Sequence, residues 1–209
     1  MIEQLIDAGR RVGAKQLTWG TAGNLSVRLP GGGRFAISGT GQRIDELTPE
    51  RVVSCDVRGE AWEGDVRPSI EAGMHRGVYA RRADAGAVLH SSAFFTTLVA
   101  CSDVELAPGA TSDTVYYLRR VARVPFHAPG SAALAEAVAD AAVEHEAILL
   151  GNHGSVVHAP DLASAINLAE VLELMCRMVV AREQGFPLRT IALAAQADML
   201  RSLAGYGAA

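Results

Sequence analysis

The sequence predicts one α/β domain over residues 1–209. The length suits a single domain, because a chain of this size buries roughly 70% of its unfolded surface and needs no disulfide or metal to fold. Hydrophobic residues make up 49% of the chain and charged residues 20%, a globular composition that excludes global disorder. Helical and strand patterns are mixed along the sequence without an internal repeat or linker, which is typical of a layered α/β domain.

The N-terminal part of the sequence predicts a helix followed by a hairpin. Apolar side chains recur at helical spacing over residues 2–17, which indicates an amphipathic helix. Residues 25–29 alternate between apolar and polar side chains, as in a half-buried strand. The glycine-rich turn that follows leads into a strand over residues 34–38. A Thr-Pro helix start at residue 48 then precedes a further strand over residues 52–57.

A second helix is predicted to begin at Pro68. Ile70, Met74 and Val78 repeat every four residues and are expected to share its buried face. Glu71 would then lie in the first helical turn, where the helix dipole favours an ionised carboxylate.

The C-terminal half alternates between short apolar runs and capped helical segments. Asp161 is placed to cap the helix that follows it, and Gly185 is a stop signal for that helix. Residues 103–120 carry no clear pattern. The expected elements are a strand over residues 87–89 ending at His90, a strand over 121–126, a strand over 147–150 that breaks at 151–154 and resumes at 156–157, and helices over 93–101, 130–144, 161–184 and 191–203.

Charge and hydropathy exclude several classes of function. The formal net charge is −4 and no basic run is longer than two residues, so no nucleic-acid partner is expected. The longest uncharged stretch, residues 85–102, contains a histidine, serines and threonines, which makes it a poor membrane span. Glu3 and Asp7 would interrupt the apolar core of a signal peptide. We therefore expect a cytoplasmic protein with a small-molecule substrate.

Two histidines at strand ends are candidate metal ligands. His90 ends one apolar strand, and His153 follows another in a Gly-Asn-His-Gly sequence. The two imidazoles could converge on one ion, with Glu71 as a further ligand or as a proton carrier. Each histidine could equally be a hydrogen-bonded structural residue, so the residues by themselves leave both interpretations open. The single lysine, Lys15, argues against Schiff-base chemistry.

Glycine, threonine and serine residues before these positions have a second chemical interpretation. Backbone amides at Gly23, Asn24, Thr40 and Gly41, together with Ser69 at a predicted helix start, are donors of the kind that hold a phosphate. They could also be turn and cap residues only, and their spacing favours that simpler interpretation.

Five motifs in register resemble the class II aldolase/adducin family. The resemblance runs from about residue 3 to residue 187, which is most of the chain, and depends on the motifs together rather than on any one of them. The motifs are Gly20–Arg28, Ser38–Gly41, Pro68–Glu71 with His75 and Tyr79, Ala87–His90, and Leu149–Gly154.

This resemblance implies a three-layer α/β/α fold around a central, largely antiparallel sheet. It also implies a homotetramer with active sites near subunit contacts, and an aldolase or epimerase acting on sugar phosphates, of the L-fuculose-phosphate aldolase or ribulose-phosphate 4-epimerase type. The implied cofactor is a divalent metal, with Zn²⁺ as the first expectation and Fe²⁺ or Mn²⁺ as alternatives. In the implied mechanism the metal stabilises the enediolate left by carbon–carbon bond cleavage.

The resemblance also implies roles for individual residues. Glu71 corresponds to the catalytic acid/base and to a metal-site carboxylate. His90 and His153 correspond to metal ligands. The positions that correspond to substrate phosphate binding are Gly23, Asn24, Thr40, Gly41 and Ser69.

The sequence departs from the family pattern at three places. The usual His-x-His has become His90-Ser91-Ser92, and a neutral serine hydroxyl is a poor zinc ligand. Ile70 replaces the second serine of the phosphate-binding pair. The expected tyrosine has no clear counterpart. Candidate replacements are Tyr116, Tyr117 and Tyr206 for the tyrosine, and His127 or, less favourably, His158 for the missing imidazole; strict strand alternation from His153 would direct His158 to the opposite face.

Three functions follow as competing hypotheses. The first is a metal-dependent aldolase that cleaves or forms a carbon–carbon bond in a small sugar or sugar-phosphate-like hydroxy carbonyl compound. The second is an epimerase, dehydratase or decarboxylase of the same fold, using a reduced metal site in which Ser92 replaces a histidine. The third is a non-catalytic binding module like the adducin head.

Overall fold

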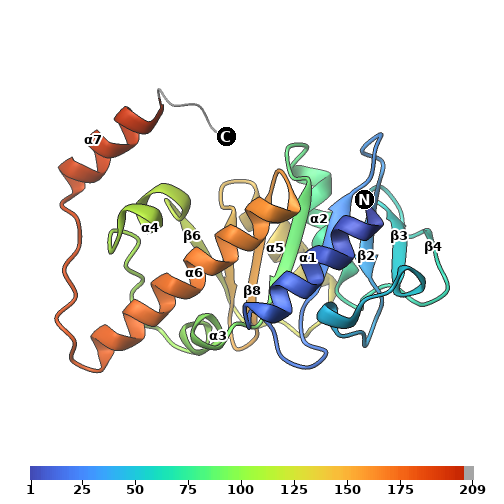
Figure 1. The fold of residues 1–209 in the computed structure, drawn as a ribbon, viewed down its shortest axis with the longest axis horizontal. Coiled ribbons are helices and arrows are strands. Elements are labelled where there is room, and N and C mark those ends of the chain that lie inside the picture. The colour runs from blue at the N-terminus through green and yellow to red at the C-terminus, as the bar shows by residue number, and fades with distance from the viewer. Residues whose placement is uncertain (205–209) are drawn as a thin grey trace.

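An eight-stranded mixed sheet forms the centre of the protein. We describe residues 1–204 of a computed structural model (Figure 1). The strand order is β4-β3-β2-β1-β5-β8-β7-β6, and every neighbouring pair is antiparallel except β6 and β7. This confirms the expected largely antiparallel sheet. The strands are β1 (Asn24–Arg28), β2 (Arg34–Ser38), β3 (Val52–Asp56), β4 (Trp62–Glu63), β5 (Ala87–Ser91), β6 (Val121–Val124), β7 (Ala147–Leu150) and β8 (Gly154–Ala159).

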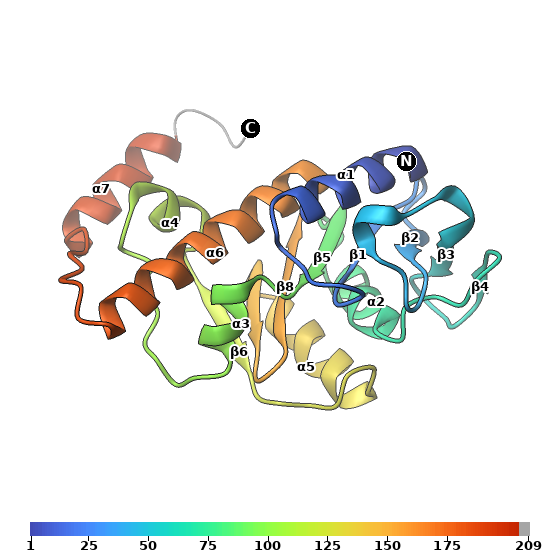
Figure 2. The same cartoon turned by 60° about the horizontal axis from the view of Figure 1, so that its bottom comes forward.

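Helices cover both faces of the sheet and complete the three layers (Figure 2). Helices α1, α3 and α6 pack on one face, and α2 and α5 pack on the other. Short 3₁₀ turns at Ile44–Glu46 and Pro49–Arg51 join β2 to β3. The helices are α1 (Ile2–Ala14), α2 (Ala72–Arg81), α3 (Phe94–Ala100), α4 (Ser112–Tyr117), α5 (Ala132–Ala142), α6 (Leu162–Glu183) and α7 (Leu193–Ala204). Among residues 1–204, no helix is both long enough and apolar enough to cross a membrane.

The central strands are buried on both faces, which explains their apolar runs. In β5, Ala87 and Leu89 belong to the core under α1 and α6, whereas Val88 belongs to the core under α2 and α5. Successive side chains of a strand point to opposite faces. His90 therefore lies on the same face as Val88, the face covered by α2 and α5.

The start of α2 differs from the sequence expectation. The helix begins at Ala72 rather than at Pro68, because Pro68 forms an isolated bridge with Gly39 and the next residues form a turn. Ile70 is 66% exposed, so the prediction that it lies on the buried helix face was wrong. Glu71 is the residue before the helix rather than part of its first turn, and its side chain makes no capping hydrogen bond.

The chain at residues 151–154 turns back instead of resuming the same strand. β7 and β8 form an antiparallel hairpin in which Leu150 pairs with Gly154. Asn152, at φ +55°, lies in the turn, and His153 follows it there. Strand alternation from His153 therefore does not apply to His158. The imidazole of His158 is engaged elsewhere, because its Nε2 bonds to the carbonyl of His145 at 3.1 Å.

The segment without a clear sequence pattern contains a short helix. α4 begins with a capping box in which the side chains of Thr111 and Thr114 bond to each other's backbone amides. Tyr116 and Tyr117 lie in this helix, and Tyr206 lies outside the described residues.

Arg28 ties the β1–β2 hairpin to the end of α2. Its guanidinium donates to the carbonyls of Gly32 at 3.0 Å, Tyr79 at 2.9 Å, Arg82 at 2.7 Å and Ala85 at 2.8 Å. The Tyr79 and Arg82 carbonyls belong to the C-terminal end of α2, where the helix dipole favours a cation.

Replacing Arg28 with methionine is expected to lower the free energy of unfolding by about 2–4 kcal/mol, because several carbonyls would lose a charged donor. Urea unfolding of Arg28→Met measures this loss. Arg10→Met is the matched control, since Arg10 is exposed on α1 and a surface change of this kind costs within about 0.5 kcal/mol. Equal stability of the two variants would contradict the role assigned to Arg28.

Candidate metal centre

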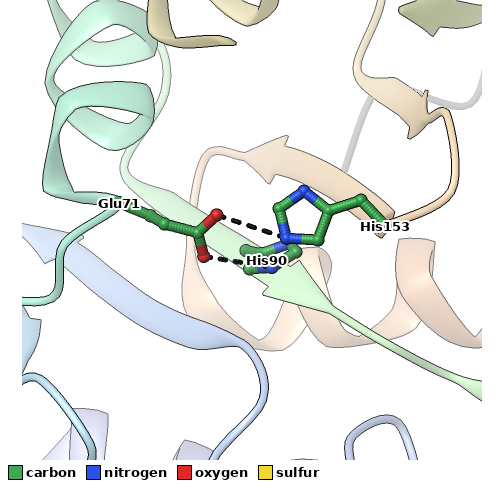
Figure 3. Close-up of side chains that lie close together, drawn as sticks. All are labelled: Glu71, His90 and His153. Atoms are coloured by element: carbon green, nitrogen blue, oxygen red, sulfur yellow. Dashed lines mark ion pairs between the residues drawn. The ribbon is translucent and has the colours of Figure 1, made fainter. Parts of the chain in front are cut away.

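Three side chains from separate elements meet on the α2 side of the sheet (Figure 3). Glu71 comes from the turn before α2, His90 from β5, and His153 from the turn between β7 and β8. Glu71 and His90 are buried, at 6% and 1% exposure, and His153 is partly exposed. Two turns and one strand thus bring together residues that lie far apart in the sequence.

The distances are those of a possible divalent-metal site. Glu71 Oε2 lies 3.2 Å from His90 Nε2, and Glu71 Oε1 lies 3.3 Å from His153 Nε2. One ligand atom from each of the three residues lies within 4.8 Å of the other two. Two imidazoles and a carboxylate are a donor set used by catalytic zinc and by non-haem iron.

The hydrogen bond made by His90 fixes which of its ring nitrogens carries a proton. Nδ1 lies 2.9 Å from the carbonyl oxygen of Ser155, and a carbonyl can only accept, so Nδ1 carries a proton. In the neutral ring Nε2 then presents a lone pair towards Glu71. A carboxylate oxygen and an imidazole lone pair repel each other unless a proton or a cation lies between them. A metal-binding histidine typically donates the N–H of its other ring nitrogen to a carbonyl, as His90 does to Ser155.

Burial favours the neutral form of His153. Desolvation lowers the pKa of His153, neighbouring His90 lowers it further, and Glu71 opposes this shift. A neutral imidazole is the form that binds a metal ion. His153 is therefore held in the protonation state that a metal site requires.

Two buried polar atoms at the site lack a hydrogen-bond partner among the described residues. They are Glu71 Oε1 and His153 Nδ1. An isolated buried carboxylate is costly, so such a group is usually neutralised by a cation or a proton. The unpartnered Glu71 oxygen fits a site built to receive one.

Ser92 lies beside His90 at Gly154. A Cβ placed on Gly154 would lie 3.3 Å from Ser92 Oγ and 3.5 Å from the Cε1 of His90, so both side chains border Gly154. Within residues 1–204, Glu71, His90 and His153 form the one cluster with metal-ligand spacing. Neither His127 nor His158 supplies a replacement imidazole there.

Of the residues expected to hold a phosphate, Gly23, Asn24 and Ser69 lie next to members of the three-residue cluster. Gly23, at φ +81°, passes so close to β5 that a Cβ would be 2.7 Å from the carbonyl of His90. Ser69 Oγ accepts from the amide of Glu71 at 3.2 Å. Thr40 and Gly41 are exposed on the loop after β2. Asn24 is buried, and its side chain is occupied by protein partners.

A buried row of hydrogen bonds behind Glu71 was not assigned a role from the sequence. Asn24 Nδ2 donates to Glu71 Oε2 at 3.0 Å, and Asn24 Oδ1 contacts His75 Nε2. His75 Nδ1 lies 2.6 Å from Ser26 Oγ, which lies 2.8 Å from the hydroxyl of Tyr79. Burial lowers the pKa of His75 to about 3 and raises the pKa of Tyr79, so both side chains are neutral at physiological pH.

The sequence spacing of these residues could have predicted this row of hydrogen bonds. Glu71, His75 and Tyr79 are four residues apart, as on one helix face, and Asn24 and Ser26 are two apart, as on one strand face. Polar residues repeating with both periods predict a buried polar contact between a helix and a strand.

Comparisons with known proteins found similar sequences and structures over most of the chain. The family described as "Class II Aldolase and Adducin N-terminal domain" matches residues 3–180. A 3-oxo-tetronate 4-phosphate decarboxylase of Haemophilus influenzae is 35% identical over 176 residues, covering 82% of each chain. A 5-deoxy-D-ribulose 1-phosphate aldolase of Bacillus thuringiensis serovar kurstaki is 31% identical over 176 residues, covering 84% of this chain and 82% of the relative. The solved structure of an L-fuculose 1-phosphate aldolase superposes with a TM-score of 0.87 at 27% identity, covering 97% of this chain and 95% of the other.

Proposed function

The chain belongs to the class II aldolase and adducin family, and we propose that it is a divalent-metal-dependent lyase that cleaves or forms a carbon–carbon bond in a small sugar phosphate. It is an enzyme of the class II aldolase superfamily. The observation that carries the proposal is the convergence of Glu71, His90 and His153, in which one carboxylate oxygen faces each imidazole and Glu71 Oε1 has no hydrogen-bond partner among the described residues.

The three residues fit a divalent metal in number and in ligand type. Glu71, His90 and His153 would hold the ion. When bound, the ion supplies Lewis-acid stabilisation of negative charge that develops on substrate oxygens. Zn²⁺ is the first expectation, with Fe²⁺ or Mn²⁺ as alternatives.

Glu71 is proposed to move the proton. Its Oε2 accepts from Asn24, which leaves Oε1 as the oxygen available to take or return a proton at the substrate. A general acid or base contributes about 10²–10⁴-fold to a reaction rate. The second nitrogen of His90 is tied to Ser155 and holds that ring in place.

The substrate phosphate is proposed to lie at Gly23, Asn24, Thr40, Gly41 and Ser69. Because the Asn24 side-chain amide already bonds to Glu71 and His75 and its backbone pairs with His90 in the sheet, Asn24 would border the phosphate rather than donate to it. Thr40 and Gly41 are exposed and close to Ser69, whose amide donates to the carbonyl of Ser38. We further propose the homotetramer expected of the family.

The experiment that tests the function combines metal analysis with turnover. Protein purified without added ion is analysed for bound zinc, iron and manganese, and is assayed for cleavage of ketose 1-phosphates and for decarboxylation of a 3-oxo-tetronate 4-phosphate. We expect about one metal ion per chain and turnover in one of the two assays. Protein that neither contains nor binds a divalent metal and turns over neither substrate would refute the proposal.

A decarboxylase, dehydratase or epimerase is the second candidate, and Ser92 favours it. A serine at this position leaves the ion with fewer protein ligands than a third histidine would, which suits a substrate different from that of an aldolase. Aldol cleavage and decarboxylation both break a bond to the carbon beside a carbonyl, so one site can serve either reaction.

Ser92→His is expected to tighten zinc binding about tenfold or more, because an imidazole is a far better zinc ligand than a hydroxyl. Zinc titration against a competing chelator measures the change, and Ser92→Ala is the control that should bind zinc like the wild type. A large gain in ketose-phosphate cleavage would favour the aldolase. Tighter binding without that gain would favour the second candidate. Unchanged zinc affinity would place Ser92 away from the ion.

A further inference from the structure

We propose that His75 is a positioning residue for Glu71, acting through a one-directional row of hydrogen bonds that runs from Tyr79 through Ser26 and His75 to Asn24. This inference builds on the proposed function, because it concerns how the same carboxylate is held. The row makes the two oxygens of Glu71 unequal, with Oε2 bound to Asn24 and Oε1 left for the ion or the proton.

The direction of the row follows from the chemistry of its last member. As a carboxylate, Glu71 accepts at Oε2, so Asn24 presents its NH₂ group to Glu71 and its carbonyl oxygen to His75. His75 must then carry its proton on Nε2. A flipped Asn24 amide would place two acceptors against each other at Glu71.

The other side of His75 sets the same direction. With its proton on Nε2, the ring accepts at Nδ1, so the hydroxyl of Ser26 donates to it. Ser26 Oγ in turn accepts from the hydroxyl of Tyr79. The helix supplies His75 and Tyr79 and the strand supplies Asn24 and Ser26, so the packing of α2 on β1 fixes the order.

The row holds a geometry rather than passing a proton. His75 is fully buried and neutral, and the Asn24 amide does not exchange a proton in a relay of this kind. Networks of satisfied buried polar groups rigidify their surroundings. The expected effect of breaking the row is therefore on the orientation of Glu71, and not on binding of the substrate phosphate.

Two variants of His75 separate this role from simple packing. Gln at position 75 has an NH₂ group near the place of Nε2 and can still donate to Asn24. Asn is one methylene shorter and can satisfy Ser26 but not Asn24. Both remove the imidazole, so a purely structural role predicts similar losses in the two variants.

We expect His75→Asn to lower kcat about 10- to 100-fold, the range seen when residues that orient a metal site are changed, with KM within about threefold of the wild type. We expect His75→Gln to recover most of that loss. The visible absorption spectrum of the Co²⁺-loaded protein should change in His75→Asn and return towards the wild type in His75→Gln. Wild-type kcat and spectrum in a folded His75→Asn, or equal losses in both variants, would overturn the proposal.

Nitrogen NMR of histidine-labelled, metal-free protein supplies a test that does not need activity. We expect His75 to be neutral with its proton on Nε2 in the wild type, and a proton on Nδ1 would refute the inferred direction. This measurement also applies if His75→Asn fails to fold. It separates the two proposals, because a wild type without metal binding or turnover would refute the function and leave the tautomer result to decide the row.

Discussion

Glu71→Gln is expected to lower kcat by about 10³-fold or more, since it removes both a proton carrier and a charged metal ligand. Asn24 donates to Oε2, so the new side chain would place its oxygen there and its NH₂ group at the Oε1 position, 3.3 Å from His153 Nε2. That NH₂ group would donate to the His153 nitrogen and occupy the lone pair meant for the ion. Turnover assays and zinc titration of the variant measure both losses.

Two control variants make this result specific. Glu71→Asp keeps the charge but withdraws the carboxylate by one methylene, so we expect zinc binding to be weakened less than in Glu71→Gln. His127→Ala removes a histidine outside the cluster, and we expect its zinc content and turnover to match the wild type. Near-normal kcat and zinc content in Glu71→Gln would show that this carboxylate is not the reacting group.

Acid is expected to destabilise the fold through His75. The pKa of His75 is about 3 in the folded protein, against about 6.5 in an unfolded chain. Above pH 6.5 the ring is neutral in both states and the stability is fully present. Below pH 6.5 the unfolded chain binds a proton that the folded protein excludes until about pH 3, so stability falls by up to about 1.4 kcal/mol per pH unit.

Urea unfolding at pH 7 and pH 4 tests this expectation. The His75 contribution to the loss between the two values should be about 3 kcal/mol, from some 2.5 pH units below the unfolded pKa. His75→Gln lacks the titrating ring but keeps a polar side chain, so its loss should be smaller by that amount. Equal losses in the wild type and the variant would show that His75 does not hold a depressed pKa. Burial also lowers the pKa of His158, so His158 adds to the loss of stability in acid.

Local sequence patterns predicted most of the secondary structure. The strands over residues 34–38 and 147–150 agree with β2 and β7 at both ends, and Asp161 caps α6 as expected. These elements have strong local signals, because apolar runs, caps and turn glycines depend on residues that are close in the chain. Segments whose form depends on distant partners were less readable, such as residues 68–71, where the pairing of Pro68 with Gly39 delays the start of α2.

The candidate site was predictable in its members but not in its arrangement. The sequence by itself determined an α/β chain with a glutamate and two histidines next to strand or helix ends, because those positions follow from local periodicity and residue type. The tertiary structure alone decided that Glu71 lies in a turn before α2, that His153 lies in a hairpin turn, and that Asn24, at the end of a row of buried polar side chains, donates to one oxygen of Glu71. The physical reason is that side-chain directions across a sheet depend on strand register and helix packing, which join residues too far apart in the chain for local patterns to record.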